Sequence, residues 1–221
     1  MQEKNNDRVL SIQGIKRLPY YLNLLKELQA QGKTSVAAAA IADSLKIYEV
    51  QVRKDLAAVS SQPGKPRVGF TVNALIEDIE HFLGYDHVNT AVLVGAGHLG
   101  QALMSYGEFN HYGLKIAAAF DVSADLIGHC IHGIKVHPME DMQSLCQQKK
   151  IDIGIITTPV ACAQEVCDQL VKCGVKAIWN FAHVYLRVPK GIIVQNEDMA
   201  VSFALLSNHL AHADQEIPAE E

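Results

Sequence analysis

The sequence has no apolar run long enough to cross a lipid bilayer. Its longest apolar runs, such as AVLVGAG and IGIITTPV, are far shorter than the ~20 residues that a membrane-spanning helix needs. The first residues, MQEKNNDRVL, are polar and lack the apolar core of a secretion signal. We therefore expect a cytoplasmic protein without membrane contact.

The sequence also lacks the paired cysteines of a disulfide framework. Its cysteines are odd in number, and no two stand in C-x-x-C spacing. In a reducing compartment they are most simply free thiols, and a regulatory disulfide is the alternative. These cysteines are Cys130, Cys146, Cys162, Cys167 and Cys173.

A recognisable metal motif is missing as well. The densest group of possible ligands lies in HCIHGIKVH, which contains His129, Cys130, His132 and His137. This spacing matches no common zinc pattern, and histidines in a loop usually face water. We expect no bound metal.

Charge is unevenly distributed along the 221 residues. Residues 1–73 hold 11 Lys and Arg against 6 Asp and Glu, whereas residues 74–221 hold 8 against 18. A basic first third indicates contact with a polyanion, although small helical domains often carry a few surplus lysines. The length and the 49% share of hydrophobic residues favour two modest domains.

Three helices are predicted in the first third. The first lies in PYYLNLLKELQAQG, with Pro19 in its first turn and Gly32 as its stop. The second, VAAAAIADSL, takes Thr34 or Ser35 as its cap. After a short connection, the third runs from about Glu49 to Val59.

The third helix has two distinct faces when its residues are placed at about 100° intervals. Val52, Leu56 and Val59 fall on one side, which should pack inward. The opposite side offers polar groups that can reach base edges in the major groove and nearby phosphates. This order of helices is the helix-turn-helix arrangement. The residues expected to contact DNA from this helix are Gln51, Arg53 and Lys54.

A hairpin is expected next, in SSQPGKPRVGFTV, where GKP is typical of a turn and RVGFTV of a strand. A hairpin bearing Lys65 and Arg67 beside a helix-turn-helix is the wing of a winged helix, whose tip can meet DNA. A structural hairpin with two solvated charges is the alternative. NALIEDIEHFLGYD then predicts a connecting helix.

The segment NTAVLVGAGHLGQAL carries Gly95, Gly97 and Gly100 in G-x-G-x-x-G spacing. The branched run before the glycines predicts a buried parallel strand, and the run after them predicts a helix. The helix N-terminus would attract phosphates, and Gly97 would let the backbone touch the pyrophosphate. This segment therefore predicts a dinucleotide site.

Asp121 ends the next predicted strand, LKIAAAFDV. A carboxylate there can accept hydrogen bonds from both ribose hydroxyls of the adenosine half, and it would repel a 2′-phosphate. The following DVSAD offers no arginine to hold such a phosphate. The pattern favours NAD(H) over NADP(H).

Strands and helices alternate further on. GIKV predicts a brief strand, IDIGIITTPV a strand that ends at Thr157 and Thr158, and VKAIWNFAHV one that ends near Asn180 and Phe181. ACAQEVCDQLVKCG, between the last two, predicts a helix. Such alternation predicts a parallel sheet with its ligand crevice at the carboxyl ends of the strands.

A small NAD-dependent oxidoreductase is one alternative. Hydride transfer needs a substrate pocket and an acid–base residue beside the nicotinamide. The region from about Asn89 to Met199 fits one nucleotide domain and leaves no substrate domain. His183, just past a strand end, is the one candidate base worth testing. We assign no catalytic residue and expect a protein that is not an enzyme.

Further motifs are KRLPYYLNLLKEL, QVRKDL and RVGF in the first third, and VLVGAGHLGQAL, AAFDV, AQEVCDQLVKCGVKAIWNFAHV and QNEDMA beyond it. With these segments the chain resembles, nearly end to end, the Rex family of redox-sensing transcriptional repressors. The resemblance implies a homodimer that exchanges C-terminal helices, binds operators when NADH is scarce and leaves them when NADH accumulates. It also implies that Tyr106 and Met199 border the nicotinamide, and that Asp198 pairs with a charged or hydroxyl group in one dimer state.

The chain departs from the family at several positions. Residues 58–61, Ala-Val-Ser-Ser, replace the neighbourhood of a Tyr-Phe-Gly-Glu-like segment. Asn23 stands where arginine is expected, and His183 stands where proline is usual. A DNA-binding relative with a lost or altered redox response is therefore the second alternative.

The sequence thus predicts an α/β protein in three parts. Residues 1–84 form a winged helix-turn-helix domain with a connecting helix, residues 85–200 a Rossmann-like parallel-sheet domain, and residues 201–221 a C-terminal dimerisation helix. That last helix, VSFALLSNHLAH, has a stripe too apolar for solvent, although packing on its own domain is the alternative. The expected ligands are NADH or NAD⁺ and a palindromic double-stranded DNA operator. The expected NAD(H) contacts are Gly95, Ala96, Gly97, His98, Leu99, Gly100, Tyr106, Asp121, Val122, Thr157, Thr158, Pro159, Asn180, Phe181, Asp198 and Met199.

Overall fold

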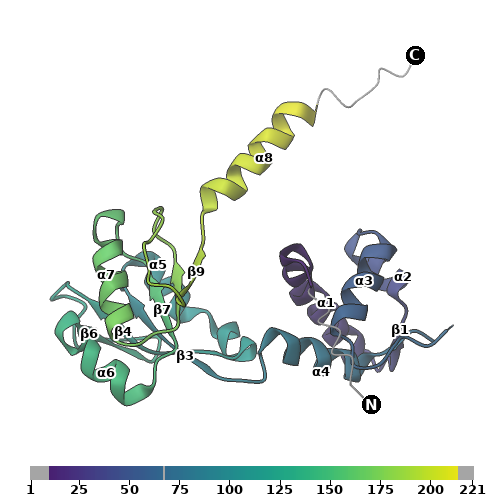
Figure 1. Cartoon of the computed structure of the whole chain (residues 1–221), viewed down its shortest axis with the longest axis horizontal. Coiled ribbons are helices and arrows are strands. Elements are labelled where there is room, and N and C mark those ends of the chain that lie inside the picture. The colour runs from purple at the N-terminus through teal and green to yellow at the C-terminus, as the bar shows by residue number, and fades with distance from the viewer. Residues whose placement is uncertain (1–9, 67, 214–221) are drawn as a thin grey trace. The chain divides into compact units, whose positions relative to one another are not determined.

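The computed structural model describes residues 10–66 and 68–213 of the chain. The chain divides into two compact units, Met1–His87 and Val88–Glu221. Figure 1 draws the first unit in purple to blue and the second in teal to yellow. The first unit is helical with a small hairpin-like sheet, and the second is built on a mostly parallel sheet, so the predicted fold class is confirmed.

The first unit packs its helices around one apolar core. Its buried side chains include Leu18, Tyr21 and Leu25 from the first helix and Val52 and Leu56 from the third. The elements in chain order are α1 (Ile12–Ala30), β1 (Ser35–Val36), α2 (Ala38–Leu45), α3 (Glu49–Val59), β2 (Phe70–Thr71) and α4 (Val72–Leu83).

Two helix starts differ from the sequence-based prediction. The first helix begins at Ile12, so Pro19 lies inside it rather than in its first turn. Proline gives up one helical hydrogen bond there, and burial of the neighbouring Leu18 and Tyr21 offsets that loss. The second helix begins at Ala38 rather than after Thr34 or Ser35, because Ser35–Val36 pairs as a strand with Phe70–Thr71.

The wing is shorter than RVGFTV suggested. The backbone groups of Lys65 and Gly69 exchange two hydrogen bonds of 2.8 Å and close a turn between them. The strand after it, β2, covers Phe70–Thr71 and pairs with β1 rather than with the other arm of the turn. Arg67 lies outside the described residues.

The second unit contains a seven-stranded sheet in the order β5-β6-β4-β3-β7-β8-β9. All neighbouring pairs are parallel except β5 with β6. The chain starts in the middle, builds outward to β6, and then returns beside β3, which places a topological switch point between β3 and β7. The strands are β3 (Asn89–Val94), β4 (Leu114–Asp121), β5 (Cys130–Ile131), β6 (Ile134–Pro138), β7 (Ile153–Ile156), β8 (Ala177–Asn180) and β9 (Ile193–Asn196).

Both faces of the sheet are covered. Along β3, Val92 and Val94 join a core with α6 and α7, while Ala91 and Leu93 join a second core with α5. Alternate side chains of one strand thus enter two cores, which explains its continuous apolar sequence. The helical segments are α5 (His98–Ser105), η1 (Gly107–Tyr112), η2 (Met139–Asp141), α6 (Met142–Lys149), α7 (Val160–Lys172) and α8 (Met199–Ala213).

The segment HCIHGIKVH is a hairpin rather than a loop. Cys130 pairs with Lys135, and His132 (φ 49°) and Gly133 (φ 81°) form the two-residue turn. The described part of the chain contains no group of three or more metal-ligating side chains. It also contains no helix long and apolar enough to span a membrane.

All five cysteines are free thiols, as predicted. Burial raises the pKa of Cys146 to about 12 and also raises the pKa values of Cys167 and Cys173. A raised pKa keeps a thiol protonated and unreactive. These three cysteines therefore have the properties of core residues.

Candidate functional sites

A pocket of about 600 Å³ opens at the carboxyl ends of the central strands. Its position is that of the crevice where doubly wound sheets bind nucleotides, at the switch point between β3 and β7. The pocket is lined by Val94, Gly95, Gly97, Leu99, Asp121, Val122, Met139, Thr157, Thr158, Pro159, Val160, Cys162, Val166, Phe181, Ala182 and His183.

The glycine turn brings the start of α5 against the sheet. Gly95 has φ 103°, and a Cβ there would approach the Thr157 carbonyl group to 2.9 Å. A Cβ on Gly100 would collide with the carbonyl oxygen of Gly95. The turn thus requires glycine at both positions for steric reasons, as a dinucleotide turn does.

Gly97 differs from these two glycines, because a Cβ added there would meet no heavy atom within 4 Å. Its backbone is extended (φ −70°, ψ −168°), a conformation that any residue adopts. Gly97 also lines the pocket and is the N-cap of α5. A side chain at Gly97 would therefore extend into open space beside the pocket.

The Asp121 carboxylate is held at the end of β4 beside the glycine turn. It accepts hydrogen bonds from the backbone N–H of Ala96 (2.6 Å) and of Ser123 (2.8 Å). A carboxylate has about four acceptor positions, so two remain for a ligand. The geometry leaves Asp121 able to accept from ribose hydroxyls.

Two threonines follow β7 and differ in their hydrogen bonding. The Thr157 hydroxyl donates to the turn, with the Gly95 carbonyl oxygen 2.7 Å away. The Thr158 hydroxyl is buried in the pocket wall. Among the residues described, it is the one buried side-chain nitrogen or oxygen without a hydrogen-bond partner. A buried hydroxyl without a partner is costly, so a ligand that satisfies it gains affinity.

Asn180 is an anchor for the segment after β8. It is fully buried, and its amide donates to the carbonyl oxygens of Ala182 (3.1 Å) and Val184 (2.8 Å) and to Asn196 Oδ1 (2.8 Å). Its own oxygen accepts from the Ala182 N–H. Asn180 therefore shapes the pocket from behind rather than lining it.

A chain of aromatic rings runs from η1 to the pocket. Ring centroids are 4.9 Å apart for Tyr106 and Phe109, 5.6 Å for Phe109 and Trp179, and 5.0 Å for Trp179 and Phe181. Phe181 lines the pocket, whereas Tyr106 does not. The ring of Tyr106 is thus connected to the pocket through packed neighbours.

The structure gathers most of the predicted nucleotide contacts in one pocket. The missed lining residues, such as Met139 and Cys162, come from the segment after β6 and from the start of α7, where the sequence shows no motif. The contacts of the other predicted residues with a nucleotide stay predictions. The predicted residues outside the pocket lining are Ala96, His98, Gly100, Tyr106, Asn180, Asp198 and Met199.

Helix α3, which carries the predicted DNA contacts, is fixed by a buried carboxylate that the sequence did not reveal. Asp55 is 1% exposed and accepts from Arg17 (2.7 and 3.0 Å), Tyr21 (2.8 Å) and Gln51 (2.8 Å). Burial by itself would raise the pKa of Asp55, but the hydrogen bonds outweigh it and hold the pKa below its usual range. The hydrogen bond with Asp55 raises the pKa of Arg17 in turn.

This network changes the role expected of Gln51. The side chain is half-buried and its amide N–H donates to Asp55, so it is not on the fully open face. Lys54 is exposed on that face. Gln51 and Arg53 each have a side-chain partner on α3 itself, so Lys54 is the predicted contact best placed to meet DNA directly.

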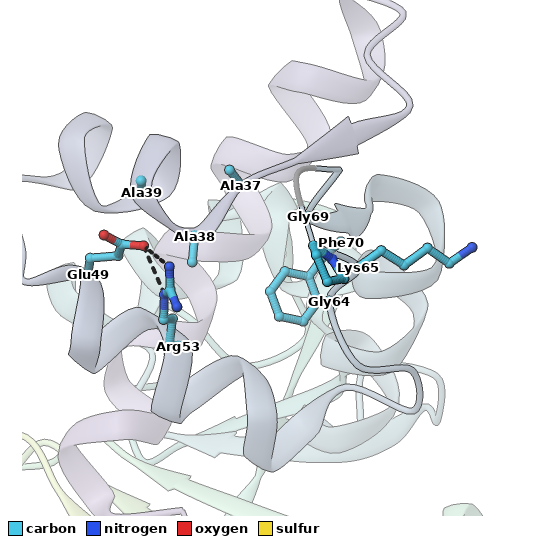
Figure 2. Close-up of a pocket in the computed structure, with 10 residues that line it drawn as sticks. Ala37, Ala38, Ala39, Glu49, Arg53, Gly64, Lys65, Gly69 and Phe70 are labelled. Carbon is cyan, nitrogen blue, oxygen red and sulfur yellow. Dashed lines mark hydrogen bonds and ion pairs between the residues drawn. The ribbon is translucent and has the colours of Figure 1, made fainter.

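A second concavity, of about 580 Å³, lies between α2, α3 and the wing. Figure 2 shows Arg53 paired with Glu49 on one side and Lys65 extending away from the hollow on the other. The Arg53 pair is exposed, with N–O distances of 2.8 and 2.6 Å, and such pairs are worth less than about 1 kcal/mol. Arg53 can therefore exchange Glu49 for a phosphate at little cost.

Two family models match the chain. One, described as a putative DNA-binding protein N-terminus, matches residues 10–57, and the other, described as a CoA binding domain, matches residues 86–184.

Curated relatives match across both regions. Three of them carry the name redox-sensing transcriptional repressor Rex. The protein of Bacteroides thetaiotaomicron is 39% identical over 196 residues and 89% of each chain. That of Treponema denticola is 40% identical over 90% of this chain and 94% of the relative. That of Enterococcus faecalis, named Rex 1, is 32% identical over 97% and 99%.

Solved structures give the same result. RSP, described as a Rex-family repressor, superposes with a TM-score of 0.82 at 30% identity, over 94% of this chain and 96% of its own. RSP in complex with β-NAD⁺ and operator DNA gives a TM-score of 0.86, and RSP in complex with β-NADH gives 0.81, both at 30% identity. The similarity therefore includes both units.

Proposed function

Because this chain belongs to the Rex family of redox-sensing transcriptional repressors, we propose that its second unit binds NAD(H) in the pocket at the switch point and its first unit binds operator DNA through α3 and the wing. The protein is an NADH-sensing, DNA-binding repressor and not an enzyme. The observation that carries the site assignment is the glycine turn, whose one open position faces the pocket.

The dinucleotide would lie across the crevice with a fixed direction. Its adenosine ribose meets Asp121 at the end of β4, and its pyrophosphate meets Gly97 and the start of α5. The nicotinamide half then reaches the ends of β7 and β8, where Thr158 and Phe181 line the pocket. This direction assigns the Thr158 hydroxyl to the redox-active half.

The apolar lining of the nicotinamide half supports discrimination between the two cofactor forms. NAD⁺ carries a positive charge on its ring and NADH does not, so desolvation penalises NAD⁺. A difference of ~3–4 kcal/mol would give a hundredfold to nearly thousandfold preference for NADH. The experiment that tests the proposal is a gel-mobility assay of an operator-like palindrome with increasing NADH.

Lys54→Ala is expected to weaken operator binding by about 1–3 kcal/mol, the range for a side chain at a base edge. Lys65→Ala is expected to weaken binding to all DNA sequences and to lower the salt slope by about one, because its expected partner is a phosphate. Both effects can be measured as DNA affinities by anisotropy at several salt concentrations. Lys33→Ala, another exposed lysine of the first unit, is the control. Normal operator affinity of Lys54→Ala would show that another face of α3 meets the DNA.

We also propose that α8 joins two copies of the chain. Every described side chain from Met199 to His212 is exposed, and Phe203 and Leu210 are 69% and 66% exposed. At about 100° per residue, Met199, Phe203, Leu206 and Leu210 form one stripe. An exposed apolar stripe of this kind usually packs against another protein surface, and a palindromic operator matches a two-fold protein.

We propose residues 1–84, 85–200 and 201–221 as the domain boundaries.

The dimer proposal predicts that Leu206→Glu lowers the mass measured by sedimentation at micromolar concentration from dimer to monomer. A charge inside an apolar interface lacks both water and a partner, which makes association unfavourable. Asn208→Glu, on the opposite side of the same helix, is the control and should remain dimeric. A wild-type protein that sediments as a monomer would contradict the proposal.

A further inference from the structure

His183 connects the pocket to the first turn of α8. Its side chain lines the pocket, and its Nδ1 lies 3.1 Å from Oδ1 of Asp198. The same oxygen of Asp198 accepts from the backbone N–H of Ala200 (2.8 Å), at the start of α8. Oδ1 of Asp198 thus contacts both His183 in the pocket and the backbone at the start of α8.

The segment that carries His183 is held in place. Asn180 binds the carbonyl oxygens on either side of it, at Ala182 and Val184, and binds Asn196 at the end of β9. Glu197, next to Asp198, accepts from the indole N–H of Trp179 (3.1 Å). His183 and Asp198 therefore project from two strand ends that partly buried hydrogen bonds fix to each other.

We propose that His183 is a positioning residue that transmits occupancy of the nicotinamide half of the pocket to α8 through Asp198. The inference rests on the proposed function, in which the nicotinamide reaches the ends of β7 and β8 and α8 joins the two copies. A ligand that shifts the imidazole changes its bond to Asp198, and this bond helps to fix where α8 leaves the sheet. The orientation of α8 would then set the relation of the two copies on the operator.

The test measures coupling rather than binding alone. The Kd for NADH is determined with and without saturating operator, from the quenching of Trp179, the one tryptophan of the chain, and the ratio of the two values is compared between variants. His183→Gln removes the imidazole. Asp198→Asn keeps an oxygen for the start of α8, because asparagine is an equally good cap, but removes the charge. His111→Gln is the control, since His111 is an exposed histidine paired with Glu108 at 3.2 Å and does not line the pocket.

We expect the ratio to fall about two- to fivefold in His183→Gln and in Asp198→Asn, the range for a partly exposed ion pair. The double variant should show no further fall, and His111→Gln should keep the wild-type ratio. A wild-type ratio in His183→Gln, or effects that add in the double variant, would overturn the role of His183. A ratio of one in the wild-type protein would instead overturn the proposed function itself, and the link with it.

Discussion

Gly97→Val should hold its operator at every ratio of NADH to NAD⁺. The valine side chain would occupy the space that the pyrophosphate must enter at the start of α5, so NADH binding is lost. The fold should survive, because the backbone of Gly97 is extended and a Cβ added there meets no heavy atom within 4 Å. A ligand shifts an equilibrium only through differential binding to its two states, and a protein that cannot bind NADH cannot be released by it. The measurement is operator binding against an NADH titration.

A matched control is available for this variant. Gly107→Val makes the same change at another glycine with open space around it, outside the pocket at the switch point, and should release DNA as the wild-type protein does. Asp121→Ala is expected to behave like Gly97→Val but more mildly, through loss of ribose hydrogen bonds worth about 1.5–3 kcal/mol. Release of DNA from Gly97→Val at the wild-type NADH concentration would mean that the glycine turn is not the sensor.

Asp55→Ala should unfold the first unit under conditions in which the wild-type protein is folded. Removing the carboxylate leaves Arg17 without its partner and Tyr21 with a buried hydroxyl that has lost its acceptor. Breaking a buried pair costs about 3–5 kcal/mol, and the lower figure applies because Arg17 stays 24% exposed. Operator binding should be lost, whereas quenching of Trp179 by NADH, a property of the second unit, should persist.

The control for this variant is Asp43→Ala, which removes an exposed aspartate of the same unit. It should leave the denaturation midpoint close to that of the wild-type protein. If Asp55→Ala also kept that midpoint, the hydrogen-bond network between α1 and α3 would have no part in stability.

The lowered pKa of Asp55 gives the same pair a predictable pH dependence. A carboxyl whose pKa is lower in the folded state contributes stability above its unfolded pKa of about 4 and loses it as the pH falls through the folded value. The first unit should therefore lose stability at acidic pH in the wild-type protein, whereas Asp55→Ala should lack this part of the pH dependence. The measurement is the same denaturation series run from neutral to acidic pH.

The elements that periodicity defines could be predicted, and those that depend on tertiary contacts could not. The prediction of a helix over Glu49–Val59 is confirmed, because Val52 and Leu56 mark its buried face. Asp55 shares that side of the helix, yet nothing in the sequence distinguishes its buried carboxylate from a solvated one, since its partner Arg17 is 38 residues away. Strand β9 could not be predicted because it is an edge strand with mostly exposed side chains.

The candidate site likewise contains residues that a local sequence pattern predicts and residues that only the fold brings together. The glycine turn and Asp121 follow a local pattern with a steric reason for each residue, and the structure places them in one pocket. Met139 and Cys162 line that pocket because the sheet order brings the ends of β6 and β7 beside the turn, which no local pattern encodes. The bond between His183 and Asp198 joins residues after two different strands and equally required the fold.

NADH, and not NAD⁺, is expected to release this protein from its operator. The most direct measurement is the fluorescence anisotropy of a labelled palindromic operator bound to the wild-type protein, titrated in parallel with NADH and with NAD⁺. NADH should dissociate the complex at a concentration about a hundredfold or more below any at which NAD⁺ does. Dissociation by both forms at equal concentrations, or by neither, would contradict it.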